Sequence, residues 1–209
     1  TNEYGDNRFY NREVTPGEAG CMLSHYQVIL NAYKQGFQNI LILEEDFVPL
    51  NKFPLQEILD EVPSDCSILY LDRNALWDSN KETRISKNVT KVGYSYNNHA
   101  YIVTRKGMNE VINSPILDNI IISDEFFPAI NGTSDRLDAV EKFHDPKFKA
   151  YSLNGGYFNQ SSNIDIDSTT ESTPKKQPII EAPKMKEILD CNNWDEWSKK
   201  YIHPLVLSK

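Results

Sequence analysis

Residues 15–47 read TPGEAGCMLSHYQVILNAYKQGFQNILILEEDF, and this stretch indicates both the fold class and the position of a site. Thr15, followed three residues later by Glu18, makes a capping-box pattern, with a proline at the first helical position between them. Apolar side chains then recur at intervals of three and four residues, which predicts one apolar face of a helix. The residues of this face are Met22, Tyr26, Ile29 and Tyr33.

A strand is expected directly after this helix. Gly36 stands where helices often end in the left-handed conformation. The run 39–43 (NILIL) is continuously apolar, which is typical of a strand buried on both faces. It stops abruptly at three acids, Glu44, Glu45 and Asp46, so helix, strand and acids form one unit.

Outside this unit the chain alternates between strand and helix patterns. The alternation predicts an α/β fold whose sheet is mainly parallel and flanked by helices. Residues 161–184 are rich in Ser, Thr, Asp and Pro, which predicts a linker or lid. Residues 185–209 are expected to form a C-terminal helix and tail that pack on the domain or on a partner subunit, as in a homodimer. The expected helices are 54–62, 106–113 and 124–130, the expected strands are 67–71, 100–104 and 148–153, and residues 74–98 are expected to form a hairpin or long loop.

The composition is globular and argues against several classes of protein. The chain has 209 residues, with 22 Lys and Arg against 30 Asp and Glu and a net charge of −8. This acidic balance argues against a duplex-DNA binder, which normally presents a basic face. No apolar run approaches the length of a membrane span, and the first residues lack a signal-peptide pattern. We therefore expect a soluble protein that does not bind nucleic acid. The composition leaves its compartment open between the endoplasmic-reticulum lumen and the cytoplasm.

The acids after the first strand are a candidate metal site. In an open α/β sheet, ligands bind beyond the carboxyl ends of the strands, where Glu44, Glu45 and Asp46 are expected. Along an extended chain Glu44 and Asp46 point the same way, so both could bind one hard cation such as Mg²⁺ or Mn²⁺. Such a cation generally bridges to phosphate oxygens, which favours a metal–diphosphate site. The alternative is that the three acids form a solvated turn.

The same segment closely resembles the signature of glycosyltransferase family 25. In that family a Gly-Glu-x-Gly-Cys-x-x-Ser-His helix leads to a strand that ends in an acidic triplet, usually Glu-Asp-Asp. Here the triplet is Glu-Glu-Asp, so Glu45 departs from the family pattern while Glu44 and Asp46 keep the alternate spacing. The later segments that resemble the family are 99–107, 123–128 and 160–164, within a match that covers about residues 4–165.

The resemblance implies a fold of the GT-A type that uses a UDP-hexose and a divalent cation, Mn²⁺ or Mg²⁺. Asp46 is then the best direct metal ligand and Glu44 the second. Family members usually begin with a strand and an Arg-rich turn that hold the uridine, and we expect the fold to lack this N-terminal nucleotide-binding strand. For His25, near the start of the first helix, the alternative is a half-buried structural histidine. The candidates for binding the donor are Ser24, His25, Glu45 and Gln160.

A transfer that inverts the anomeric centre needs a base to take the proton of the acceptor hydroxyl. Asp124 is the candidate, because it opens an expected short helix and lies in a match to the family's Asp-Glu-Phe stretch. Glu125 is the alternate. Asp124 could instead serve only as a helix N-cap, and a retaining enzyme would not require this base.

Residues 1–160 are therefore expected to form the catalytic domain of a metal-dependent hexosyltransferase. The enzyme would move galactose or glucose from a UDP-sugar to a hydroxyl. The Asp-Glu-Phe-x-Pro stretch at 124–128 favours collagen-type acceptors, hydroxylysine or galactosyl-hydroxylysine. A lipopolysaccharide sugar is the alternative acceptor, and a catalytically silent module that binds sugar or collagen is the alternative outside enzymes.

Overall fold

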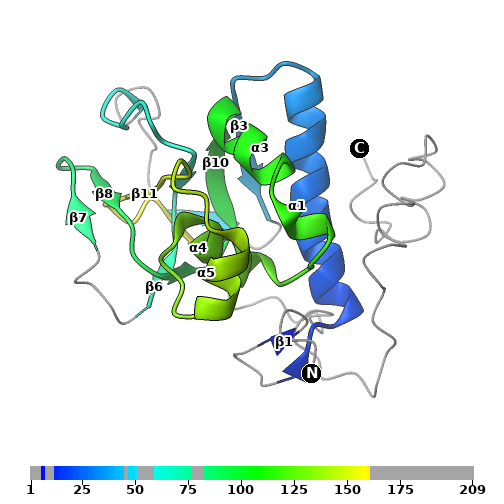
Figure 1. The fold of residues 1–209 in the computed structure, drawn as a ribbon. Helices are drawn as coiled ribbons and strands as arrows, with labels where there is room; N and C mark the ends of the chain where they lie inside the picture. The colour runs from blue at the N-terminus through cyan, green and yellow to red at the C-terminus, as the bar shows by residue number, and fades with distance from the viewer. Residues whose placement is uncertain (1–5, 8–11, 45–46, 51–58, 77–81, 161–209) are drawn as a thin grey trace.

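A mixed six-stranded sheet with helices packed against one face forms the centre of the computed structural model of the chain (Figure 1). The structure describes residues 6–7, 12–44, 47–50, 59–76 and 82–160. The helices are α1 (Pro16–Lys34), α3 (Arg105–Ile112), the 3₁₀ helix η2 (Pro115–Leu117), α4 (Ser123–Asn131) and α5 (Leu137–Phe143). The sheet contains β3 (Asn39–Leu43), β5 (Ile68–Tyr70), β7 (Thr83–Arg84), β8 (Val89–Lys91), β10 (Ala100–Thr104) and β11 (Ala150–Leu153). Three two-stranded ribbons pair β1 (Asp6–Asn7) with β2 (Arg12–Glu13), β4 (Phe47–Pro49) with β12 (Phe158–Gln160), and β6 (Asn74–Ala75) with β9 (Ser95–Tyr96).

Helix α1 begins and ends where the sequence predicts. The hydroxyl of Thr15 accepts from the Glu18 amide at 3.2 Å, and Glu18 Oε2 accepts from the Thr15 amide at 2.8 Å. This reciprocal pair is the predicted capping box, and Pro16 occupies the first helical position. At the other end Gly36 has φ +83°, the left-handed conformation that a residue with a Cβ rarely adopts.

The sheet is mixed, so the prediction of a mainly parallel sheet is wrong. The strand order is β3-β10-β5-β11-β8-β7, and the β11–β5 pair alone is parallel among the described pairs. The physical reason lies in the 71–99 segment, which leaves β5 and returns to the same edge of the sheet. Residues 71–76 and 82–99 contain no crossover helix that would carry the chain back to the start of β5, and β10 accordingly runs antiparallel to its two neighbours. Strands β3, β5 and β11 still point the same way.

Strand β3 is present, but the prediction that it is buried on both faces is wrong. Ile42 is 8% exposed, whereas Leu41 and Leu43 on the opposite face are 50% and 39% exposed. Among the described strands β3 lies at the sheet edge, and α1 covers only one of its faces. A continuously apolar run in the sequence therefore does not produce a strand that is buried on both faces in this sheet.

Two apolar clusters occupy the two faces of the sheet. Side chains of α1, α3, α4 and α5 pack with Ile68, Tyr70, Tyr101 and Val103 on one face. Alternate residues of the same strands, such as Leu69 and those of β11, pack on the other face without these helices. This alternation is the period of two that a strand imposes on its side chains. The helix-covered cluster brings α1 and α4 against the centre of the sheet.

The other predicted elements are confirmed where the structure describes them. Helices α3 and α4 and strands β5, β10 and β11 lie at their predicted positions within one or two residues. Helix α5 was not predicted, and the polar 74–98 segment contains four short strands rather than one hairpin. Most of the predicted 54–62 helix, and all of the predicted linker and tail at 161–209, lie outside the described residues.

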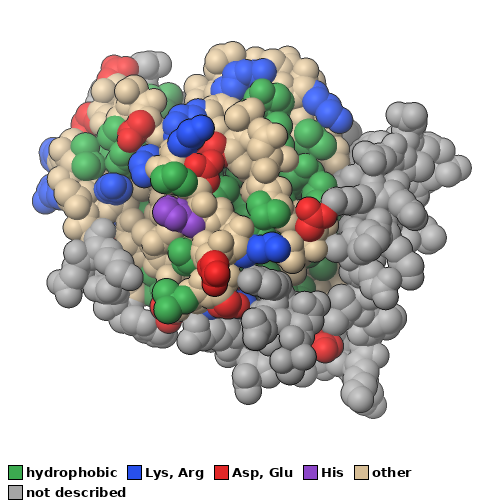
Figure 2. Space-filling view, viewed as in Figure 1, with side chains coloured by type: hydrophobic (Ala, Val, Ile, Leu, Met, Phe, Trp, Pro, Cys, Tyr) green, Lys and Arg blue, Asp and Glu red, His purple; other side chains and the backbone are tan. Residues whose placement is uncertain are grey.

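Charged side chains of both signs are mixed on the face shown in Figure 2. That face presents no broad basic patch of the kind expected for a duplex-DNA binder. Of the helices that the structure describes, none combines the length and the apolarity needed to cross a bilayer.

Candidate functional site

The site lies where strands β3 and β5 end and β10 begins, and we call this end of the strands the site edge of the sheet. Glu44 follows β3, and its amide donates to the His99 carbonyl at 2.8 Å. Asp72 follows β5, and its Oδ2 lies 3.2 Å from Nε2 of His99. The antiparallel insertion of β10 therefore brings the residues just before it to the same edge as the strand-end acids.

His25 connects helix α1 to this edge. It lies on the buried face of α1 and is 5% exposed. Its Nδ1 lies 2.6 Å from the Tyr101 hydroxyl, and its Nε2 lies 2.8 Å from Glu44 Oε1. Burial lowers the pKa of His25, but hydrogen bonds with Cys21 and Glu44 outweigh it and raise the pKa to about 10. The structure thus places His25 against an acid, with both ring nitrogens engaged.

Asp124 lies in the first turn of α4, as its second residue. The N-cap of α4 is Ile122, so the alternative that Asp124 is merely the N-cap is wrong. Asn98 donates from Nδ2 to Asp124 Oδ1 at 2.7 Å, and the Asn97 amide also donates to this carboxylate. Burial, with Glu44 adding repulsion, raises the pKa of Asp124 to about 7, against the opposing effect of His25. A carboxylate with a pKa near neutrality is suited to accept a proton.

Glu125 occupies a different environment from its neighbour. Its side chain is fully buried, and it accepts hydrogen bonds from the Tyr96 hydroxyl at 2.6 Å and the Tyr94 hydroxyl at 3.1 Å. Burial and the contact with Glu125 raise the pKa of Tyr96 well above its usual range. Glu125 therefore ties α4 to the segment around β9, and its oxygens are occupied by these two phenols.

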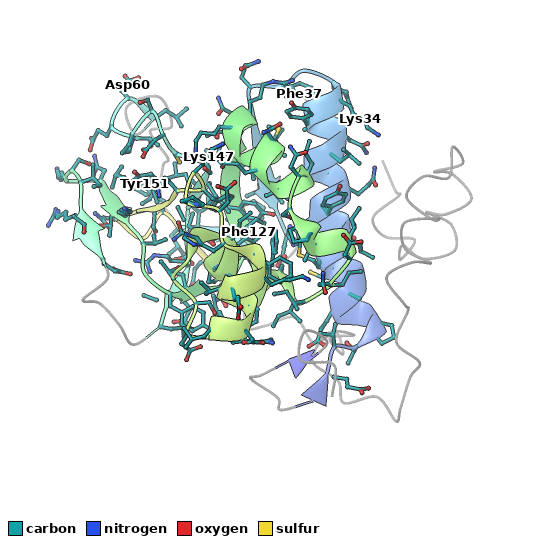
Figure 3. The ribbon with its side chains drawn as sticks, in the orientation of Figure 1. Lys34, Phe37, Asp60, Phe127, Lys147 and Tyr151 are labelled. Atoms are coloured by element: carbon teal, nitrogen blue, oxygen red, sulfur yellow. The ribbon has the colours of Figure 1, made fainter. Side chains whose placement is uncertain are left out.

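The floor of the site is a pair of packed aromatic rings. Tyr101, fully buried on β10, packs edge-to-face against Phe127 of α4 with 5.5 Å between ring centroids. Figure 3 shows Phe127 in the middle of the molecule, between α4 and the strands. Because the Tyr101 hydroxyl contacts Nδ1 of His25, the Tyr101 side chain also holds the imidazole in position. The packing thus fixes the positions of α1 and α4 relative to each other.

Cys21 lies one helical turn before His25 and faces the same acid. One ligand atom each from Cys21, His25 and Glu44 lies within 4.8 Å of the others, close enough to share a metal ion. Cys21 is half-buried and is a free thiol. Ser24, by contrast, is exposed, and its hydroxyl donates to the Gly20 carbonyl within α1 at 2.8 Å.

Several predicted site residues lie outside what the structure describes. Glu45 and Asp46 lie outside the described residues, so the predicted pairing of Glu44 with Asp46 stays a prediction. The backbone of Gln160 ends β12, beside β4, but its side chain is not described. Among the described candidates, the structure brings His25, Glu44 and Asp124 together and leaves Ser24 on the outside.

Sequence reasoning missed three side chains of the site: Cys21, Asn98 and Tyr101. Cys21 belongs to the Gly-Cys-x-x-Ser-His pattern but was not assigned to the site, although its i, i+4 spacing to His25 is a usable signal. Tyr101 lies within the 99–107 segment, and no local pattern distinguishes it from a core residue. Asn98 gave no signal, because its contact with Asp124 depends on the reversal of β10.

Comparison with known proteins gives a consistent picture. Residues 1–127 match the family model described as glycosyltransferase family 25 (LPS biosynthesis protein). The chain is 32% identical over 76% of its length to a procollagen lysyl hydroxylase and glycosyltransferase of Acanthamoeba polyphaga mimivirus, of which the match covers 19%. It is 26% identical over 69% of its length to procollagen galactosyltransferase 1 of Danio rerio, of which 25% is covered. Procollagen galactosyltransferase 2 of Homo sapiens is 23% identical over 69% of the chain and 24% of that protein. The chain thus spans about a fifth to a quarter of these relatives.

Proposed function

Because the chain belongs to glycosyltransferase family 25, we propose that it transfers a hexose from a UDP-sugar to a hydroxyl acceptor. The family model covers residues 1–127, which include both α1 and the start of α4. Relatives named procollagen galactosyltransferases favour galactose as the sugar and procollagen as the acceptor. We propose hydroxylysine as the acceptor residue, because the name of the mimivirus relative joins lysyl hydroxylase to glycosyltransferase, and glucose transfer to galactosyl-hydroxylysine as the alternative reaction.

The observation that carries this proposal is the environment of Asp124. Its pKa of about 7 leaves a substantial fraction ionised near neutral pH yet able to hold a proton once it is taken. The Asn98 amide at 2.7 Å orients the carboxylate. In an inverting transfer, Asp124 would remove the proton from the acceptor hydroxyl. Glu125 serves as its structural anchor, since two tyrosine hydroxyls already occupy its oxygens.

The donor is proposed to lie on the α1 side of the same edge. His25 and Glu44 are in contact there, and Asp46 follows two residues later in the sequence. Carboxylate oxygens suit Mn²⁺ or Mg²⁺, and the Glu44 carboxylate lies close enough to Asp124 to add, after burial, to the rise of its pKa. We propose Asp46 as the main ligand and Glu44 as a second one. Bound there, the cation would stabilise the diphosphate as it leaves. Ser24, Glu45 and Gln160 remain proposals for donor contacts.

A second acceptor class is supported by the description of the family. Its model is described as an LPS biosynthesis protein, so a lipopolysaccharide sugar is the alternative acceptor. A module that binds sugar or collagen without turnover is the alternative outside enzymes.

A UDP-release assay separates these proposals. The chain is incubated with UDP-galactose or UDP-glucose and Mn²⁺, with hydroxylysine-containing collagen peptide or oligosaccharide as the acceptor. We expect UDP release that requires the collagen peptide and is lost in Asp46→Ala and after chelation. Release with oligosaccharide alone would favour the lipopolysaccharide alternative. No release with any combination would refute the enzyme proposal.

A further inference from the structure

We propose that Cys21, His25 and Glu44 form a binding site for a thiophilic divalent cation such as Zn²⁺. This site overlaps the oxygen-liganded cation site proposed for the transferase at Glu44, but its other two ligands, Cys21 and His25, are its own. It stands on the described residues and does not require that the chain be an active transferase.

The first argument is geometric. Cys21 and His25 are four residues apart on α1, so their side chains emerge one turn apart on the same side of the helix. Glu44 approaches from the end of β3, and the three ligand atoms lie within 4.8 Å of one another. A cation among them would bind two side chains of one rigid helix and one side chain of the adjoining strand end.

The second argument is the orientation of the imidazole. The Tyr101 hydroxyl contacts Nδ1 at 2.6 Å, which leaves Nε2 directed at Glu44. Metal-binding histidines almost always have their second nitrogen fixed by a hydrogen bond in this way. Tyr101 is itself immobilised by full burial and by packing against Phe127. The ring that would bind the cation is therefore already held in place.

The third argument is the chemistry of the donor set. A thiolate, an imidazole and a carboxylate together favour Zn²⁺ or Co²⁺ over Mg²⁺ and Mn²⁺, which prefer oxygen ligands. Three protein ligands leave a fourth tetrahedral position for water or a substrate atom. Glu44 and Cys21 are both half-buried, so a cation can reach them from solvent. Occupancy by Zn²⁺ would engage Glu44 and so inhibit any activity that uses this carboxylate.

Cobalt binding tests the site directly, because a cobalt–thiolate bond absorbs in the near ultraviolet. The full chain, reduced and metal-free, is titrated with Co²⁺ alone. The variants are Cys21→Ser, which removes the proposed thiolate, and the double variant Cys66→Ser/Cys191→Ser, which removes the other two thiols. Glu44→Gln serves as a second variant that keeps all three cysteines.

We expect the charge-transfer band in the wild type and in the double variant, and its loss in Cys21→Ser. Glu44→Gln should keep the band but weaken Co²⁺ binding at least tenfold, since it removes one of three ligands. Zn²⁺ should displace Co²⁺ and raise the melting temperature of the wild type but not that of Cys21→Ser. Absence of a band in the wild type, its persistence in Cys21→Ser, or its loss in the double variant would overturn the proposal.

Discussion

Replacing Asp124 with asparagine should stabilise the fold at neutral and alkaline pH while it removes the proposed base. The pKa of Asp124 is raised from 3.8 to about 7, mainly by burial and by the charge of Glu44. The native state thus holds this proton more tightly than the unfolded chain does. As the pH rises from about 4 to about 7, the free energy of unfolding of the wild type falls, because ionisation costs more in the native state. Asparagine does not ionise, so the variant escapes this loss.

The size of the effect follows from the pKa values. A rise of about three pH units corresponds to at most about 4 kcal/mol, at about 1.4 kcal/mol per unit. Because the Asp124 side chain is partly exposed, solvent screening reduces this, and we expect about 2 kcal/mol at pH 8. For a protein of this size, this equals an increase of roughly 4–8 °C in melting temperature. The asparagine can still accept the hydrogen bond from Asn98, so the fold should be retained.

Thermal unfolding in a chelating buffer, followed by circular dichroism from about pH 4 to pH 8, measures this difference. The advantage of Asp124→Asn should be small near pH 4, grow toward pH 7 and then level off. Glu141→Gln, on the exposed side of α5, is the matched control and should show no such dependence. In the UDP-release assay, Asp124→Asn should lose about 10²- to 10⁴-fold in kcat. A stability difference that is the same at both ends of the pH range would refute the assigned pKa, and an unchanged kcat would refute the base role.

Three further changes test the packing and polar contacts around the site. Gly107→Ala would place a Cβ 2.1 Å from the backbone oxygen of Ser67, just before β5, so the free energy of unfolding in urea should fall by about 3 kcal/mol. In the control Gly20→Ala the new Cβ has no atom within 4 Å, so the free energy of unfolding should rise by up to about 1 kcal/mol. Equal stabilities of the two variants would contradict the close packing of α3. Asn98→Ala removes a hydrogen bond that favours the ionised form of Asp124, so the acidic limb of the pH profile of kcat/KM should move up by about one pH unit. The control Asn113→Ala should leave this limb in place. A profile that falls in rate without moving would assign Asn98 a structural role only. Tyr96→Phe leaves the buried Glu125 carboxylate without its shorter hydrogen bond, so the free energy of unfolding in urea should fall by about 1–3 kcal/mol. No measurable fall would show that water replaces the phenol.

The local elements of the fold follow from the sequence because their causes are local. The capping box at Thr15, the left-handed Gly36 and the apolar strand runs each predict a helix end or a strand without reference to distant residues. Strand direction is different, since it depends on whether the 71–99 segment crosses the sheet or returns to the same edge. Nothing in the composition of that segment specifies its path, and the sheet was therefore wrongly predicted as mainly parallel.

The candidate site was predictable to the same extent. Residues that follow a strand or open a helix, such as Glu44 and Asp124, could be placed at the site edge from pattern alone. Asn98 could not, because it reaches Asp124 only through the reversal of β10. The contact of His25 with Glu44 likewise depends on how α1 packs across the sheet, although the resemblance to the family had already singled out both residues.

The path of the 71–99 segment also has a consequence for how this protein can be altered. Its two ends are joined by a hydrogen bond of 3.0 Å from the Leu71 amide to the Ala100 carbonyl, on strands paired at the centre of the sheet. The entropic cost of closing such a loop grows only slowly with its length. A change of length between β6 and β7 should therefore cost little stability, while β5 and β10 keep their register. Exchange of the whole segment would cost more, because it supplies β7 and β8 to the sheet, Asn98 to Asp124 and the His99 carbonyl to Glu44.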